Sequence, residues 1–180
     1  MCHFVIKYKG HIVLYRRKQS MIGSKIQAMF LENQDHFLVP ASEVAHVQME
    51  NNLNHALLVL TKIGFNVIVV LDKQSHVRGL ISIPLIMEAI TGVRQMNFEQ
   101  LDVLKVGEIM RTDFALLEEN YELEDMLHLL VDNPFICMVD NENKFSGIIT
   151  RREILKSVNH VVHEFEHHYD VREKEETIYN

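Results

Sequence analysis

The sequence predicts an α/β (α+β) protein in which two tandem β-α-β-β-α modules pack as a pseudo-twofold pair. Two segments, Leu53–Ser82 and Tyr121–Thr150, align without a gap and keep the same order of residue classes. In each segment, apolar residues at helical spacing precede an apolar run, a polar break and a second apolar run. One unit of roughly 60 residues is marginally stable alone, so two copies are expected to pack together.

The elements of the first copy follow from apolar spacing and from residues that begin or end helices. In chain order they are a strand at Val44–Met49, a helix through Leu53, Leu57, Leu60 and Ile63, strands at Val67–Leu71 and Val77–Ile81, and a helix at Ile83–Ile90. The apolar runs are rich in β-branched residues, which favours buried strands. Ser82 is a candidate N-cap for the last helix and Gly92 a candidate end.

The second copy repeats this order. It predicts a strand at Phe114–Leu117, a helix at Glu122–Val131, a strand at Phe135–Val139, a turn at Asp140–Asn143, a strand at Lys144–Ile149, and a helix from Arg151. Residue identity between the copies is low, but the turn and strand-end positions match. Asp72 aligns with Asp140, Gly79 with Gly147, and Ser82 with Thr150.

This repeat, together with two local strings, resembles a known family. The strings are Val-Ala-His-Val-Gln at 44–48 and Gly-Ile-Ile-Thr-Arg-Arg at 147–152. The chain resembles a pair of CBS domains, the regulatory module also called a Bateman domain. It is most similar to the CbpB/DarB group of cyclic di-AMP receptors from Gram-positive bacteria. The resemblance spans about residues 21–161 and implies a nucleotide-binding regulator.

The resemblance and the composition divide the chain into five parts. We expect CBS module 1 at 21–92, a linker at 93–105, CBS module 2 at 106–162 and a charged C-terminal tail at 163–180, with fraying after Asp170. Residues 1–20 are basic where the rest is acidic and lie outside the resemblance. They are interpreted as an extra segment from a misplaced start, with Met21 as the true start. The alternative is an amphipathic strand or helix added to the fold.

Charge and composition exclude several classes of protein. The chain has 18 basic and 25 acidic residues and a net charge of -7, which argues against a general binder of nucleic acid or anionic membranes. Its two cysteines lack the spacing of a disulfide or metal framework, as expected for a cytoplasmic protein. No apolar run reaches the roughly 18 residues of a membrane span.

The strongest candidate site lies where the last strand meets the last helix. Thr150, Arg151, Arg152 and Glu153 occupy this junction, and a helix N-terminus favours anions. Two arginines there are locally unfavourable, which indicates an expected anion, and arginine binds phosphate in bidentate fashion. The alternative is a T-x-x-E capping box with solvated arginines. In CBS domains the positions of Thr150 and Glu153 typically contact a ribose.

The resemblance places further ligand contacts on other strands. The strand entry Glu43, Val44, Ala45 and His46 is expected to face Thr150–Arg152 across a cleft between the modules. The strand start Phe135 and Ile136 is expected to read adenine. Ordinary burial in the core is the alternative for Ala45 and for the Phe135 and Ile136 side chains. Glu43 departs from the family, whose members often carry a basic residue there.

The first module lacks the matching chemistry. Ser82-Ile83-Pro84-Leu85 keeps the hydroxyl residue but has neither the arginines nor the acid. We therefore expect one strong phosphate site in each chain. Cys137 is interpreted as a core residue, and the histidines at 160, 163, 167 and 168 as surface helix residues, so no metal site is expected.

Three classes of function remain. The first is a non-catalytic sensor of cyclic di-AMP that controls a protein partner, for which the resemblance implies a Rel-type stringent-response synthetase or a metabolic enzyme. The second is a sensor of AMP, ADP or ATP. The third, an enzyme or metal protein on the same scaffold, lacks a P-loop, GxSxG or HExxH motif. An almost uniformly apolar helix at Asn54–Lys62 predicts a homodimer.

Overall fold

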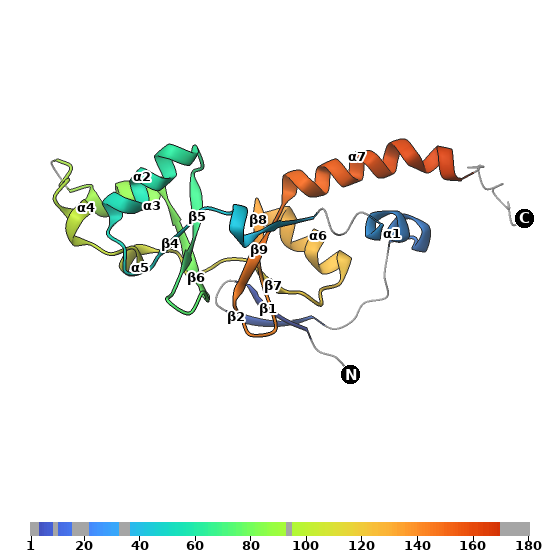
Figure 1. Cartoon of the computed structure of the whole chain (residues 1–180), viewed down its shortest axis with the longest axis horizontal. Coiled ribbons are helices and arrows are strands. Elements are labelled where there is room, and N and C mark those ends of the chain that lie inside the picture. The colour runs from blue at the N-terminus through green and yellow to red at the C-terminus, as the bar shows by residue number, and fades with distance from the viewer. Residues whose placement is uncertain (1–3, 9–10, 16–21, 33–36, 93–94, 170–180) are drawn as a thin grey trace, which may run out of the picture.

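The computed structural model describes residues 4–8, 11–15, 22–32, 37–92 and 95–169 (Figure 1). In chain order its elements are β1 (Phe4–Tyr8), β2 (His11–Tyr15), α1 (Ser24–Leu31), β3 (Leu38–Pro40), the 3-10 helix η2 (Ala41–Glu43), β4 (His46–Gln48), α2 (Leu53–Ile63), β5 (Val67–Leu71), β6 (Val77–Ser82), α3 (Ile83–Ile90), α4 (Gln100–Val103), α5 (Val106–Ile109), β7 (Leu116–Glu118), α6 (Leu123–Asp132), β8 (Phe135–Val139), β9 (Phe145–Thr150) and α7 (Arg151–His168).

The two predicted modules form separate sheets. Module 1 contributes the three-stranded sheet β4-β5-β6, and module 2 contributes β7-β8-β9 to a six-stranded sheet of order β2-β1-β7-β8-β9-β3. In each module the first pair of strands is parallel and the second pair is antiparallel. The predicted mixed α/β fold with two tandem modules is therefore confirmed.

The helices cover the outer faces of the sheets, and the inner faces pack against each other (Figure 1). Strand alternation produces this arrangement: Val70 faces the core under α2 and α3, whereas Val69 faces the other module. The inner faces meet in what we call the inter-sheet cluster. Its buried members are Val69, Leu71, Leu80, Cys137 and Phe145, and it is surrounded by half-buried Ala41, Val44, Val67, Val77, Phe114, Phe135 and Ile148.

Each module also closes the open edge of the other. β3, near the start of module 1, pairs antiparallel with β9 of module 2 through Val39 and Ile148. On the opposite side, Arg111, near the start of module 2, bridges Leu80 of β6 in module 1, with N–H···O distances of 2.9 and 2.8 Å. Leu80 and Ile148 are equivalent positions of the repeat, so the exchange is reciprocal. It is a long-range pairing that fixes the two modules to each other.

The repeated glycine makes room for this exchange. A methyl group on Gly79 would lie 2.6 Å from the Arg111 carbonyl oxygen, and one on Gly147 would overlap the Val39 carbonyl oxygen. Gly147 also has φ +155°, a conformation that L side chains rarely adopt. The alignment of Gly79 with Gly147 thus reflects the close approach of a strand from the other module.

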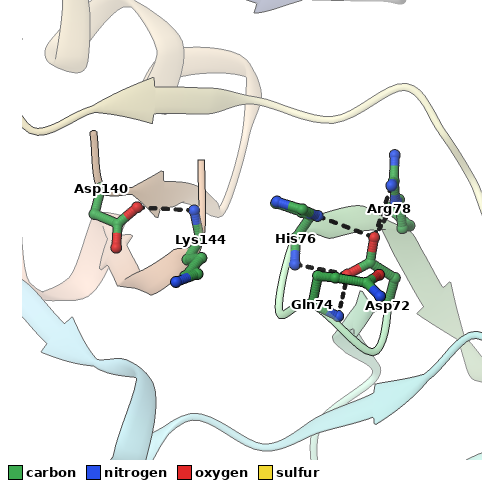
Figure 2. A network of polar contacts seen from close by, with 6 residues as sticks. All are labelled: Asp72, Gln74, His76, Arg78, Asp140 and Lys144. Atoms are coloured by element: carbon green, nitrogen blue, oxygen red, sulfur yellow. Dashed lines mark hydrogen bonds and ion pairs between the residues drawn. The ribbon is translucent and has the colours of Figure 1, made fainter. Parts of the chain in front are cut away.

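The turns between the paired strands also meet at the module boundary (Figure 2). Ser75 and Asn143 hold equivalent positions with φ of 67° and 62°, and the Phe145 N–H donates to the Ser75 carbonyl over 2.8 Å. Asp72 anchors the first turn. Its buried carboxylate accepts from the main chain of Gln74 and His76 and from the side chain of Arg78 at 2.7 Å.

Burial of Asp72 by itself would raise the pKa of its carboxyl group. The hydrogen bonds from His76, Arg78 and Gln74 together outweigh that effect and hold the pKa well below its usual range. In the equivalent turn, Asp140 accepts from the backbone N–H groups of Glu142 and Lys144, each at 2.9 Å. Asp72 is therefore ionised and paired, whereas Asp140 acts mainly as a turn cap.

Most predicted boundaries agree with the structure. Helix Ile83–Ile90 and strands Val67–Leu71 and Phe135–Val139 are confirmed, and Ser82 accepts from the Leu85 N–H as an N-cap. The predicted strand Val44–Met49 is wrong in extent, because β4 covers three residues, His46–Gln48, after the η2 turn. The helix α3 is capped by Thr91, one residue before the predicted glycine.

Three segments lie beside or between the modules. The first twenty residues contain the β1–β2 hairpin, which joins the sheet where Lys7 of β1 pairs with Leu116 of β7. The predicted linker contains α4, and α7 continues through His168 into the predicted tail. The fraying expected after Asp170 lies outside the described residues. In the described part of the chain, no helix is long and apolar enough to cross a membrane.

Candidate functional site

The candidate site is built on the junction between β9 and α7. The Glu153 N–H donates to Thr150 Oγ1 over 3.2 Å, so Thr150 is the N-cap that begins α7. The Glu153 carboxylate is paired with Lys156 Nζ at 2.8 and 3.0 Å. Thr150 therefore makes the N-cap hydrogen bond that the alternative capping box predicts. The helix α7, which has 18 residues, begins at this point.

The strand next to this junction brings an aromatic side chain beside it. Phe135 pairs with Thr150 across the antiparallel β8–β9 ladder, so the start of one strand meets the end of the other. The half-buried Phe135 side chain belongs to the inter-sheet cluster together with Val44 and Ile148. The structure thus brings Val44, Phe135 and Thr150, predicted from three separate segments, to one edge of the module boundary.

The other residues of the predicted strand entry point in different directions. Glu43 is exposed at the end of η2, and half-buried Ala45 packs against the module 1 core. His46 is exposed; its Nδ1 lies 3.1 Å from the Val44 carbonyl oxygen and its ring 6.5 Å from that of Phe145. Val44 is therefore the member of this group that packs against the same cluster as Phe135.

Two residues of β8 are fully enclosed. Ile136 has no exposed surface and lies in the module 2 core, so its contact with a base stays a prediction. Cys137 is also fully buried, and burial raises the pKa of its thiol to about 12. The interpretation of Cys137 as a core residue is confirmed, since a thiol in this setting stays protonated at neutral pH.

Arg151 lies against the C-terminus of α6. Its Nε donates to the Leu130 carbonyl at 2.9 Å, and its Nη2 donates to the carbonyls of Val131 and Asn133, each at 3.1 Å. The Arg151 backbone N–H donates to the Pro134 carbonyl at 3.0 Å. The sequence offered no signal for this contact, because it joins residues about twenty positions apart.

Arg152 behaves differently. It is exposed, and within the described residues it has no hydrogen bond or ion pair. Together with Arg151, Leu155, Lys156 and Asn159 it lines a shallow hollow of about 470 Å³ on α7. Three cationic side chains therefore surround this hollow at the N-terminal end of a long helix, an arrangement that favours an anion.

The equivalent corner of module 1 is apolar. Ser82 caps α3 as Thr150 caps α7, but Ile83 and Pro84 follow it in place of the two arginines. Phe114 lies beside the inter-sheet cluster and holds the position that corresponds to Val44. Sequence reasoning did not single out Phe114; its place in the repeat, two residues before β7, was the available signal.

The histidines remain apart from this site. His160, His163 and His167 are exposed on α7. Among the residues described by the structure, no group of three or more His, Cys, Asp or Glu side chains lies in an arrangement that could hold a metal ion.

Comparison with known proteins shows the family of the chain. Residues 106–160 match the family model described as CBS domain. The chain is 44% identical over 123 residues to "Cyclic di-AMP receptor B" of Bacillus subtilis, which covers 68% of this chain and 84% of the relative. The aligned stretch is longer than either predicted module, so it includes parts of both.

Two solved structures extend this similarity. The CbpB protein of Listeria monocytogenes in complex with c-di-AMP is 49% identical, covers 73% of this chain and 98% of its own, and gives a TM-score of 0.68. CbpB of Streptococcus agalactiae is 31% identical, covers 87% and 99% respectively, and gives a TM-score of 0.78. The chain belongs to the family of CBS-domain proteins that includes cyclic di-AMP receptor B and CbpB.

Proposed function

We propose that this chain is a cytoplasmic, non-catalytic receptor that binds cyclic di-AMP between its CBS modules and thereby controls a protein partner. The Listeria relative was solved with c-di-AMP and is 49% identical to this chain. The observation that carries the proposal is the convergence of Val44, Phe135 and Thr150 beside the cationic N-terminus of α7. An apolar contact for a base and cations for phosphate are the two chemistries that a cyclic dinucleotide requires.

Each part of the ligand has a candidate partner. Val44 and Phe135 offer apolar surface to an adenine, and the backbone groups of half-buried Ala45 and exposed His46 are the candidates for its polar edge. The Thr150 hydroxyl is the candidate ribose contact. The arginine pair Arg151 and Arg152 is the candidate source of the phosphate contact, because charge-assisted bonds from arginine suit phosphate oxygens. Glu43, which is exposed, is proposed to point to solvent.

A sensor of AMP, ADP or ATP is the second candidate. What favours it is the pair of Thr150 and Glu153 on the first turn of α7, the positions that contact ribose in many CBS domains. Lys156 binds the Glu153 carboxylate at 2.8 Å, which reduces the repulsion between that carboxylate and a phosphate. The doubled arginine favours the dinucleotide, since it carries two phosphates.

A thermal-shift panel separates these candidates. Cyclic di-AMP, cyclic di-GMP, AMP and ATP are added separately to the full chain, because a ligand that binds only the folded state raises its unfolding temperature. We expect the largest rise with cyclic di-AMP and little change with cyclic di-GMP. A rise with AMP or ATP but none with cyclic di-AMP replaces the first candidate with the second.

The proposed receptor acts as a homodimer and regulates its partner by ligand state. The apolar side chain of Leu58 on α2 is 64% exposed, and a twofold contact is the commonest way for two copies of a chain to cover such a side chain. The proposed partner is a Rel-type stringent-response synthetase or a metabolic enzyme, bound by the ligand-free form. Light scattering at micromolar concentration tests the dimer: a mass near 21.0 kDa, that of one chain, contradicts it.

A further inference from the structure

The two modules end their first helices with different devices. In module 1, α2 ends at Gly64, whose φ of 72° and ψ of 17° are left-handed and turn the chain away from the helix. In module 2, α6 ends at Asn133 in an extended conformation, with φ -118° and ψ 138°. A left-handed cap normally satisfies the last carbonyl groups of a helix, so α6 needs another donor for them.

Arg151 supplies that donor. The Asn133 backbone N–H and its Nδ2 both reach the Leu129 carbonyl, at 3.1 and 2.9 Å. The Arg151 guanidinium takes the next two carbonyls, of Leu130 and Val131, and that of Asn133 as well. Module 1 has Ile83 at the position of Arg151 and Gly64 at the helix end, so the arginine is present where the glycine cap is missing.

This contact also resolves an electrostatic conflict in the sequence. A cation at the N-terminus of α7 is unfavourable, but the same cation is favourable at the C-terminus of α6. Arg151 is a residue of α7, but its side chain contacts the C-terminus of α6. Its charge therefore has a protein partner without any ligand, whereas Arg152 has none among the described residues.

The connection between α6 and β8, which we call the α6–β8 corner and which Arg151 contacts, leads directly into β8, the strand proposed to contact a base. Asn133 and Pro134 connect α6 to Phe135, and Arg151 binds the carbonyls of both, at 3.1 Å through its side chain and 3.0 Å through its backbone. The side chain and backbone of one residue thus set the position at which β8 begins. Any shift of this corner moves Phe135 relative to Val44 and Thr150.

We propose that Arg151 is a positioning residue that fixes the α6–β8 corner, and that Arg152 is the phosphate-contacting member of the arginine pair. The role of Arg152 rests on the proposed function, whereas the role of Arg151 does not. The assignment changes the expected behaviour of the pair. Loss of Arg151 weakens the protein before any ligand is added, and loss of Arg152 acts on the ligand alone.

The first experiment uses no ligand. Arg151→Ala, Arg151→Lys and Arg152→Ala are compared with the parent by thermal unfolding and by amide hydrogen exchange over residues 129–135. Arg151→Ala is expected to lower the unfolding temperature by several degrees and to speed exchange at this corner. Arg151→Lys keeps the charge but loses the planar guanidinium, so its unfolding temperature and exchange rate are expected to lie between those of Arg151→Ala and the parent. Arg152→Ala is expected to match the parent in both measurements. Parent-like exchange and unfolding for Arg151→Ala overturn the positioning role.

The second experiment measures cyclic di-AMP affinity at several salt concentrations. Salt weakens contacts between exposed charges, so removing a phosphate ligand reduces the salt dependence of binding. Arg152→Ala is expected to weaken binding roughly ten- to hundredfold and to flatten the salt dependence. Arg151→Ala is expected to weaken it severalfold with the salt dependence of the parent.

The outcomes separate the two proposals. A flattened salt dependence of cyclic di-AMP binding in Arg151→Ala would show that Arg151 is a phosphate ligand and would overturn the assignment. An unchanged affinity in this variant would show that Arg151 only caps α6 and does not position the ligand-binding strand. If the parent does not bind cyclic di-AMP, the proposed function fails, while the ligand-free measurements still decide whether Arg151 holds the corner.

Discussion

Module 1 and module 2 share a backbone plan but place their polar side chains at opposite ends of it. Module 1 anchors the turn at the module boundary with buried Asp72 and Arg78, while its strand–helix junction is apolar. Module 2 carries its arginines at the junction, and Ser146 stands where Arg78 is in module 1, with its Oγ buried and unpartnered in the described structure. Under the proposed function, the duplicated fold divides structural and ligand-binding roles between its two copies.

The exchanged strands give the largest expected effect on stability. Gly147→Ala places a methyl group on the Val39 carbonyl at φ +155°. Overpacking of about 1–3 kcal/mol and backbone strain of about 1–3 kcal/mol both apply. Gly79→Ala meets the Arg111 carbonyl at 2.6 Å without the unusual φ, so only the first cost applies. Urea unfolding measures both, and equal losses would show that the two exchanges are equally constrained.

The arginine junction gives the largest expected effect on binding. Arg152→Ala is expected to cost about 1.5–3 kcal/mol of cyclic di-AMP binding, because a charge-assisted bond to phosphate is lost. Its matched control is Pro84→Ala, at the same position of module 1, which is expected to leave the affinity unchanged. Calorimetry decides between them. A comparable loss in Pro84→Ala would mean that module 1 also holds ligand.

The boundary turns give the next effect. Asp72→Asn is expected to lower stability at neutral pH more than Asp140→Asn, because it leaves Arg78 without its buried partner. The folded pKa of Asp72 lies below the unfolded one, so its contribution is present above the unfolded value of about 3.9 and is lost as pH falls through the folded pKa. Unfolding curves at several pH values test this dependence.

The difference between parent and Asp72→Asn is accordingly expected to be constant near neutral pH and to shrink in acid below the unfolded value. A difference that instead grew as the pH fell would contradict the ion-pair account of this turn.

The glycine cap of α2 gives a smaller effect. Gly64→Ala adds a side chain in open space but at φ +72°, so about 1 kcal/mol of stability is expected to be lost from conformation alone. Gly23→Ala is the control, because it also points into open space and has an ordinary φ of -57°. Similar stability of the two variants would show that the left-handed cap does not end α2.

The smallest expected effect concerns the first twenty residues. Deleting them removes the β1–β2 hairpin, which pairs with β7 through Lys7 and Leu116. We expect the deletion to leave the fold and ligand-induced stabilisation in place, since the modules and the candidate site lie elsewhere. An insoluble deletion variant would show that the edge of β7 needs its partner.

Local patterns predicted most of the elements because they depend on neighbouring residues. The apolar run Val67–Leu71 and the N-cap Ser82 carry their own signals, and the gapless repeat transferred them to module 2. The exchange of β3 and the segment at Arg111 between modules had no such signal, because pairing partners far apart in sequence leave no periodicity. The alignment of Gly79 with Gly147 was visible in the sequence, but the close approach of another strand to each glycine was visible only in the fold.

The candidate site divides in the same way. Thr150 was predictable, since an N-cap is a local feature, and its neighbours Arg151 and Arg152 appeared equivalent in sequence. Only the folded chain separates them, because the C-terminus of α6 lies beside Arg151. The convergence of Val44 with Phe135 likewise depends on the packing of one sheet on the other.

The number of cyclic di-AMP molecules bound by each chain tests most directly whether the two modules have different roles. Calorimetric titration of the full chain with cyclic di-AMP is predicted to give one dinucleotide for each chain, in a single class of sites. The cationic junction of module 2 has no counterpart in module 1, where Ile83 and Pro84 follow the capping serine. Two equivalent dinucleotides for each chain would contradict the division of roles between the modules.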